Sequence, residues 1–229
     1  AIEAITKVAD QYSNIEVVGL EVKYPQGAEK QLIYACNKRE VPSGGLPMDS
    51  GVVVNNVGTA AQIAKTIKTG MPLVKKCVTV DGGAVAEPQN VIAPIGTKYY
   101  DLVEFCGGYK SEPKKIIAGG PMMGRAQADL SVPVVKATNA ILCLMKDKNG
   151  AAENPVCLRC GKCVGVCPMR LQPLYMYRYV NAERVDELDR LHVTDCIECG
   201  SCAFTCPGKL PLVERFRRGK QLLREAKTK

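Results

Sequence analysis

The amino-acid sequence predicts three successive units: an α/β unit over residues 1–75, a small β-rich unit over residues 76–150 and a helical unit over residues 151–229. Three observations support this division. Apolar residues recur at helical spacings or in short strand-like runs in the first two units. A polar segment at residues 146–155 separates them from the rest of the chain. One cysteine-rich motif then occurs twice within the last unit.

The first unit is expected to mix helices and strands. Apolar side chains at positions 2, 5, 8 and 12 predict a helix at its start, and because Ala1 already lies in this helix we expect the chain to be a fragment of something longer. Residues 41–49 are too rich in Pro and Gly to be regular. Strands are predicted at residues 15–20 and 51–55, and helices at residues 28–36 and 59–69, the second closed by Gly70.

The second unit is expected to be a small β-rich module with few helices. A tight turn at residues 81–83 predicts a hairpin between strands at residues 76–80 and 84–87. Thr97 is expected to cap a short helix that runs to Phe105 and ends at Gly107 and Gly108. Further strands are predicted at residues 115–118 and 141–144.

The third unit contains eight of the twelve cysteines, in two copies of the pattern C-x2-C-x2-C-x3-C-P. Bacterial proteins that hold two [4Fe–4S] clusters use this spacing, and the fourth cysteine of each motif binds the cluster of the other motif. The pattern therefore predicts two crossed ligand sets. One consists of Cys157, Cys160, Cys163 and Cys206, and the other of Cys196, Cys199, Cys202 and Cys167.

Zinc and disulfides fit these cysteines less well. Structural zinc held by four thiolates normally uses two well-separated C-x2-C pairs, whereas each motif here places four cysteines within eleven residues. A disulfide framework is typical of small secreted domains, and no signal peptide is visible. Helical spacings between residues 173 and 191 predict that the joining segment is helical and fairly long, which favours an α-helical ferredoxin fold over that of a small bacterial ferredoxin.

The net charge of +8 falls to about +4 if two clusters with four thiolates each are bound. Much of the positive charge lies in residues 211–229, where a single aromatic residue and the lack of a binding module argue against nucleic acid as a partner. We expect a solvated helix packed on the cluster domain. Docking to acidic membrane-bound subunits or anionic lipid is the alternative. The sequence contains no run of eighteen apolar residues, so no membrane-spanning helix is predicted.

Other residues carry smaller expectations. His192 is expected at a helix end on the surface, and Met122 and Met123 in a packed turn. Arg159 and Lys162 flank the first motif whereas Glu198 is the charged residue inside the second, so the first cluster is expected to have the higher potential. The four remaining cysteines are expected to be small buried residues: Cys36, Cys77, Cys106 and Cys143.

Five further segments carry a joint pattern: residues 24–32, 41–49, 53–59, 94–97 and 119–124. Together with the two cysteine motifs, they resemble the C subunit of the Rnf ion-translocating electron-transport complex over essentially the whole chain. The first unit is also similar to the flavin-binding subunit of respiratory complex I, which implies a partial flavin-binding domain. The second resembles an SLBB domain, a β-grasp-like module.

This resemblance implies a site for FMN. Ala28 and Gly58 depart from the family pattern, which has Glu at both positions, and no glycine-rich G-x-G-x-x-G segment occurs in the 229 residues. We therefore expect half a flavin site that binds FMN weakly or not at all. Asn55 and Asn56 could also simply form a turn and cap a helix. The residues that match the family's flavin-binding turns are Tyr24, Gly27, Glu29, Asn55, Asn56 and Thr59.

The function implied is that of a peripheral electron-transfer subunit on the cytoplasmic face of the cell membrane, in a complex that couples ferredoxin and NAD to ion translocation. FMN would exchange two electrons with NADH, and the clusters would relay single electrons to or from partner subunits. No side chain is assigned as a catalyst, because hydride chemistry belongs to the cofactors. The alternatives are a soluble flavin-dependent cobalamin reductase of bacterial microcompartments and a ferredoxin-like docking module without NADH-linked turnover.

Overall fold

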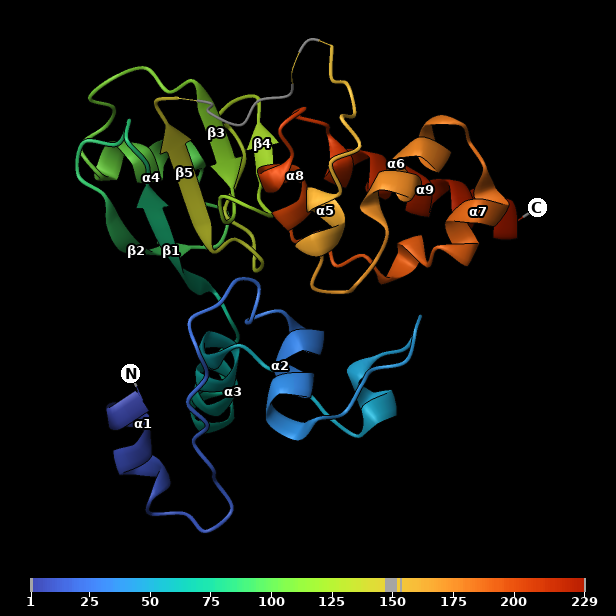
Figure 1. Ribbon diagram of the computed structural model, residues 1–229. Coiled ribbons are helices and arrows are strands. Elements are labelled where there is room, and N and C mark those ends of the chain that lie inside the picture. The colour runs from blue at the N-terminus through green and yellow to red at the C-terminus, as the bar shows by residue number, and fades with distance from the viewer. Residues whose placement is uncertain (1, 147–151, 153, 229) are drawn as a thin grey trace. The chain divides into compact units, whose positions relative to one another are not determined.

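The computed structural model describes residues 2–146, 152 and 154–228, and the chain divides into two compact units, Ala1–Val54 and Asn55–Lys229 (Figure 1). The described part of the first unit contains helices and irregular segments but no strand. Its helices are α1 (Ile2–Ala9), α2 (Glu29–Asn37) and the 3-10 helix η1 (Pro47–Ser50).

The strands predicted at residues 15–20 and 51–55 are therefore wrong. A strand is stable only when its backbone N–H and C=O groups pair with a neighbouring strand, and the described residues offer neither segment such a neighbour. The apolar side chains that predicted the strands are largely exposed, as at Val18 and Val53. In this unit an apolar pattern alone does not create a sheet.

The three helices predicted in the first 75 residues are confirmed, the first of them as α1. Helix α2 lies within one residue of the expected range, and α3 (Val57–Thr69) ends at Gly70, whose φ of 72° is the left-handed conformation that glycine adopts easily. Asn56 precedes α3 and accepts a hydrogen bond from the Gly58 N–H at 2.9 Å. Asn56 thus acts as a helix cap.

The second unit begins with α3 and continues into a five-stranded mixed sheet of order β2-β1-β5-β3-β4 (Figure 1). The β1–β5 pair is parallel, and the other pairs are antiparallel. The strands are β1 (Lys75–Asp81), β2 (Gln89–Pro94), β3 (Lys115–Ala118), β4 (Arg125–Gln127) and β5 (Ala140–Leu144).

Helix α4 (Tyr99–Phe105) packs against one face of this sheet and closes its core. Alternate residues of the central strands, such as Val78, Val80 and Ile141, point into that core because successive strand side chains face opposite sides. The buried Tyr99 hydroxyl lies 3.3 Å from the Thr138 hydroxyl, so its polar end is also satisfied.

The hairpin predicted around residues 81–83 is wrong in its second strand, because residues 84–87 do not pair with β1. Strand β1 pairs with β2, whereas Ala84 and Val85 lie in the connection between these strands, fully buried. They are fixed there by a hydrogen bond from the Ala84 N–H to the Cys143 carbonyl and by a bridge between Val85 and Tyr109. Thr97 is not the helix cap either, because its hydroxyl donates to the Pro94 carbonyl.

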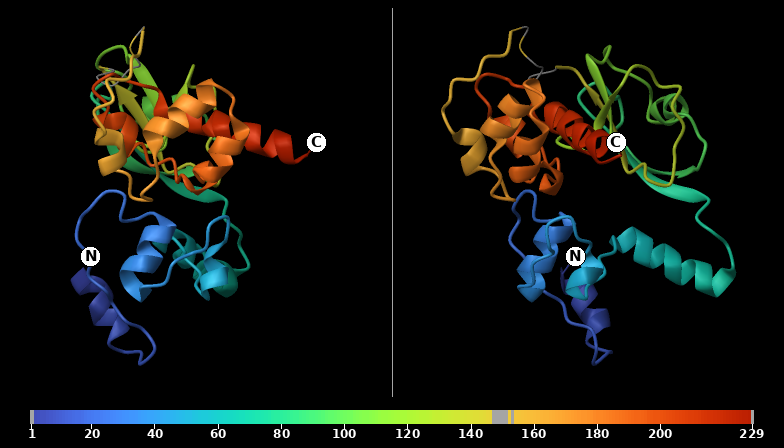
Figure 2. Two further views of the ribbon diagram at one scale, coloured as in Figure 1. Left: turned by 45° about the vertical axis from the view of Figure 1, so that its right-hand side comes forward. Right: turned by 90° about the vertical axis from the view of Figure 1, so that its right-hand side faces the viewer.

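From Lys162 onward, the regular structure in the described part of the second unit is helical (Figure 2). Its longest helix, α9, covers much of the basic tail and buries Leu212, Phe216, Leu222 and Leu223 against α6 and α7. The expected packing of the tail on the cysteine-rich domain is thereby confirmed. The helices are α5 (Lys162–Gly165), α6 (Pro173–Asn181), α7 (Val185–Arg190), η2 (Val193–Asp195), α8 (Ser201–Thr205) and α9 (Leu212–Lys227).

The prediction that the segment between residues 173 and 191 is helical is confirmed, and the structure divides it into two helices, α6 and α7. Glu183 has a φ of 49°, a left-handed conformation that ends the right-handed helix. This break lets both helices contact α9. His192 lies exposed at the end of α7, as expected. Among the described residues, no helix is long and apolar enough to cross a membrane.

The prediction that the four scattered cysteines are buried is half right. Cys106 and Cys143 lie in the sheet core, fully buried. Cys36 and Cys77 are exposed. Cys77 is exposed because it precedes the inward-facing Val78 on β1 and therefore points to the other face of the strand.

Candidate metal centres

The two cysteine motifs have the same local backbone. In each, the residue before the second cysteine is left-handed, Arg159 with φ 53° and Glu198 with φ 56°. The glycine after the second cysteine is also left-handed, Gly161 with φ 74° and Gly200 with φ 82°, and it begins a short helix, α5 or α8. The sequence repeat is therefore a structural repeat that curls the chain around its first three thiols.

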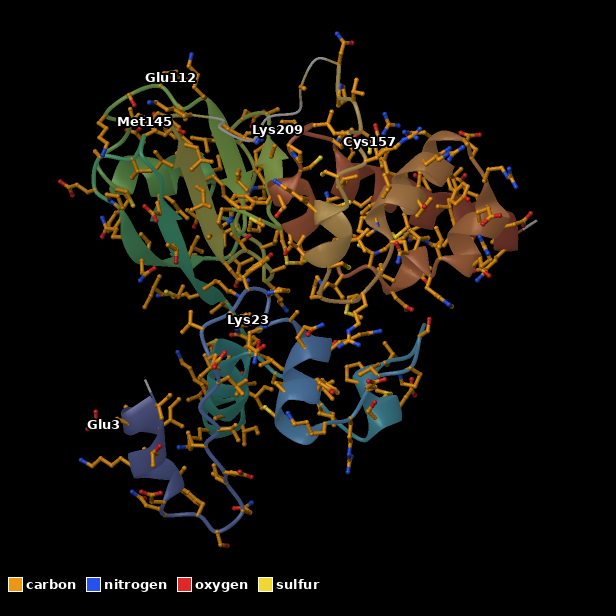
Figure 3. All side chains as sticks on the ribbon, in the orientation of Figure 1. Glu3, Lys23, Glu112, Met145, Cys157 and Lys209 are labelled. Atoms are coloured by element: carbon orange, nitrogen blue, oxygen red, sulfur yellow. The ribbon has the colours of Figure 1, made fainter. Side chains whose placement is uncertain are left out.

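The first motif forms a cavity with the end of the second motif. Its walls include the apolar side chains of Leu174, Leu210 and Leu212. Cys157, at the start of this motif, is labelled in Figure 3. The cysteines that line the cavity are Cys157, Cys160, Cys163 and Cys206.

The second motif forms a matching cavity with the end of the first motif. Its apolar walls include Leu171, Met176 and Phe216. The cysteines that line it are Cys167, Cys196, Cys199 and Cys202. The structure thus brings three cysteines of one motif together with the fourth of the other, twice.

Electrostatic coupling between the thiols follows the same grouping. Burial, and then the nearby sulfurs of Cys196 and Cys199, raise the pKa of Cys202 to about 12. Burial also raises the pKa of Cys163, to which the sulfurs of Cys206 and Cys157 contribute. Thiols with raised pKa values are protonated at neutral pH, so iron binding has to release protons from these sites.

Each cysteine set surrounds a space instead of converging on one point. Across the described ranges, no three His, Cys, Asp or Glu side chains are arranged to hold a single metal ion. A polynuclear group with iron at several corners suits such a cavity better than one tetrahedral zinc ion. The donor set of four thiols per cavity and the largely apolar walls fit a [4Fe–4S] cluster.

Glu198 links the second motif to helix α9. Its two carboxylate oxygens accept from the Arg217 Nε at 2.6 Å and from the Lys220 Nζ at 2.7 Å. The same Lys220 Nζ donates to the Cys196 carbonyl at 2.7 Å. Partial burial alone would raise the pKa of Glu198, but the hydrogen bonds from Arg217 and Lys220 outweigh it and lower that pKa. Glu198, Arg217 and Lys220 are called the α9 anchor below.

The α9 anchor compensates the negative charge of Glu198 near the second motif. The sequence suggested that Glu198 gives this motif a negative charge, but its carboxylate is matched by two cations. The part of the charge argument that relied on a negative second motif therefore no longer holds, whereas the positive charges of Arg159 and Lys162 remain beside the first motif. Sequence reasoning missed Arg217 and Lys220 because they lie 19 and 22 residues from Glu198, and only the fold brings them together.

A loop of the sheet domain approaches the second motif at Gly200. A Cβ atom at Gly200 would lie 2.8 Å from the Met122 carbonyl oxygen, closer than real side chains come. At the equivalent Gly161, nothing described lies within 4 Å. Met122 belongs to the Gly- and Pro-containing segment 119–124, so this loop packs directly on the backbone of the second motif.

Gly200→Ala is expected to destabilise the protein more than Gly161→Ala. Both variants put alanine in a left-handed conformation, which costs about 1 kcal/mol. Only Gly200→Ala also pushes against Met122, and such overpacking costs about 1–3 kcal/mol more. Urea unfolding of the two variants measures the difference. Equal losses of unfolding free energy would show that the loop does not constrain Gly200.

The residues predicted to bind flavin belong to different units. Tyr24, Gly27 and Glu29 lie in the first unit, the last at the start of α2. Asn55, Asn56 and Thr59 lie in the second. Asn56 and Thr59 line an open groove beside α3 together with three lysines, Lys75, Lys76 and Lys136.

Three known domain families match the chain in the order expected for its three parts. Residues 1–65 match the Nuo51 FMN-binding domain, residues 77–126 the SLBB domain and residues 151–207 the 4Fe-4S dicluster domain. The chain therefore belongs to the class of proteins that join an FMN-binding domain and an SLBB domain to a 4Fe-4S dicluster domain.

Within this class, the chain belongs to the family formed by the C subunits of ion-translocating oxidoreductase complexes. It is 50% identical over 195 residues to the C subunit of the Na+-translocating ferredoxin:NAD+ oxidoreductase complex of Acetobacterium woodii, covering 85% of this chain and 44% of that protein. It is also 50% identical over 173 residues to the C subunit of the proton-translocating ferredoxin:NAD+ oxidoreductase complex of Clostridium ljungdahlii, covering 76% of this chain and 38% of that protein.

A more distant relative aligns with the full chain. The C subunit of the ion-translocating oxidoreductase complex of Rhodobacter capsulatus is 38% identical over 230 residues, covering 100% of this chain and 44% of that protein. The chain thus spans less than half of the length of these curated relatives.

Proposed function

We propose that this chain is the electron-relay part of the C subunit in an ion-translocating ferredoxin:NAD+ oxidoreductase complex. It would hold two [4Fe–4S] clusters and pass single electrons between an NADH/FMN site and partner subunits, from the cytoplasmic face of the membrane. The observation that carries this proposal is the pair of similar cavities, each lined by three cysteines of one motif and the fourth of the other.

The protein's own residues have defined roles in this function. The eight cysteine sulfurs supply the iron ligands, in the crossed sets Cys157, Cys160, Cys163 with Cys206 and Cys196, Cys199, Cys202 with Cys167. The Leu171 N–H donates to the Cys167 sulfur at 3.3 Å, and hydrogen bonds to cluster sulfurs are one means of setting the reduction potential. Apolar walls exclude water. When bound, a [4Fe–4S] cluster supplies a one-electron centre.

The flavin part of the proposal rests on fewer residues. Tyr24, Gly27 and Glu29, and Asn55, Asn56 and Thr59, would contact FMN in the complete protein, where NADH would bind beside it. The lysines beside Asn56 and Thr59 would attract the phosphate of FMN. The mixed sheet with its parallel β1–β5 pair and one covering helix supports a β-grasp-like SLBB domain in the middle of the chain.

Anaerobic reconstitution of the purified chain tests the cofactor assignment. We expect about eight iron and eight sulfide per chain, as two [4Fe–4S] clusters require, and far less than one FMN per chain. Iron and sulfide analysis, flavin fluorescence and electron paramagnetic resonance of the reduced protein measure these quantities. One zinc per motif in place of iron would overturn the relay, and stoichiometric FMN would refute the half-site interpretation.

A further inference from the structure

The two candidate cluster sites differ in exposure. Cys199 and Cys202 of the second set are 7% and 8% exposed, and the second motif is covered by the α9 anchor and by the loop at Met122. In the first set, Cys160 is exposed. Because the rate of electron tunnelling falls steeply with distance, the first site is the one that a partner protein can approach closely.

The surface around the first motif carries positive charge without compensation. From Asn154 to Ala182 the chain contains no Asp or Glu. The four cations in this segment are Arg159, Lys162, Arg170 and Arg178, and all four are exposed. Among the described residues, no carboxylate lies within ion-pair distance of any of them. A bound cluster would offset only about two of these charges.

A groove and exposed apolar side chains complete this surface. The groove lies between the first motif and α6 and is lined by Cys157, Arg159, Leu174, Tyr175, Tyr177, Arg178 and Asn181. Beside it, Val156 and Leu158 are each 65% exposed. Arginine, aromatic and aliphatic residues around a groove are typical of protein interfaces. The surface formed by these residues is called the first-motif face below.

We propose that the first-motif face is the docking surface for a one-electron redox protein or subunit whose own contact surface is rich in carboxylates. This rests on the proposed function, because it requires a cluster in the first cavity. Arg159 and Arg178 attract and orient the acidic partner, and the exposed Leu158 and Tyr175 contact it. One electron leaves the protein and one acceptor centre of the partner gains it, with no bond broken and no proton moved.

Two haem proteins of opposite surface charge test this docking. Cytochrome b5 is acidic and cytochrome c is basic, and each takes one electron as its ferric haem becomes ferrous. The cluster-loaded, dithionite-reduced protein is mixed with each in a stopped-flow instrument over a range of ionic strength. We expect reduction of cytochrome b5 to slow as salt rises and that of cytochrome c to accelerate, because charge steering is screened by salt.

The double variant Arg159→Glu/Arg178→Glu should invert this preference. Glu is compatible with position 159, because Glu198 holds the same left-handed position in the second motif. We expect about tenfold slower reduction of cytochrome b5 at low salt, and faster reduction of cytochrome c. A changed cluster potential would move both rates in the same direction, so opposite shifts identify docking. The control Lys110→Glu/Lys114→Glu makes the same charge change at exposed positions of the sheet domain and should leave both rates within about twofold.

The outcomes are distinguishable. If the wild-type protein binds no iron, both the relay function and the docking surface are refuted. If it is loaded but the two double variants behave alike, the docking surface alone is refuted. If Arg159→Glu/Arg178→Glu keeps both cytochrome rates yet no longer sediments with phosphatidylglycerol vesicles that bind the wild type, the first-motif face is a lipid surface and the proposal is wrong.

Discussion

Cys206→Ala is expected to abolish the cluster of the first motif and to spare that of the second. Cys206 belongs to the second motif in sequence, but it lines the cavity of Cys157, Cys160 and Cys163. A site with three thiolates holds a cubane poorly, so we expect loss of about half of the iron, roughly four atoms per chain. Cys167→Ala should cause the same loss at the other site, because Cys167 lines the second cavity.

Matched cysteine variants test the crossed ligand sets without the need to assign each paramagnetic resonance signal to one cluster. If the ligand sets are crossed, Cys206→Ala leaves the same paramagnetic resonance spectrum as Cys160→Ala. Cys167→Ala then leaves the same spectrum as Cys199→Ala. If each motif instead holds its own cluster, Cys206→Ala will match Cys199→Ala. Cys36→Ala serves as the control, because Cys36 is exposed and lies in the other unit, so the full iron content should remain.

Lys220→Met is expected to lower the reduction potential of the second cluster and to destabilise its loop. The substitution removes a positive charge beside Cys196 together with the hydrogen bond to the Cys196 carbonyl. A one-electron centre is harder to reduce when a nearby cation is lost, by an amount on the order of tens of millivolts. Because Lys220 is 17% exposed, solvent screens part of the interaction, and we expect a loss of about 1–2 kcal/mol in unfolding free energy.

Glu198→Gln supplies the opposite charge change at the same place. It leaves Arg217 and Lys220 without their carboxylate, so the potential of the second cluster should rise. The first cluster should be unchanged in both variants, which makes it an internal reference within one molecule. A redox titration followed by paramagnetic resonance measures both potentials. Shifts of the same sign in the two variants, or equal shifts of both clusters, would show that the α9 anchor acts only on the overall fold.

The sequence correctly predicted elements whose formation depends on residues close together in the chain. Helices α2 and α3 lie within two residues of their predicted ranges, and strand β3 coincides with its range, because helical periodicity and short apolar runs act over neighbouring residues. The predictions failed where a segment needed a distant partner. The strand at residues 15–20 has no neighbour among the described residues, and Ala84 and Val85 are held by Cys143 and Tyr109 instead of by β1.

The same distinction applies to the candidate metal centres. The eight cysteines and their crossed grouping follow from the sequence alone, because the spacing of the thiols and the Pro after each fourth cysteine constrain where a short loop can direct its sulfurs. What the tertiary structure decided is the surroundings of the two sites. Packing of α9 places Arg217 and Lys220 on Glu198, and it leaves the first-motif face open, because contacts between residues far apart in the chain arise only when helices bury their apolar sides together.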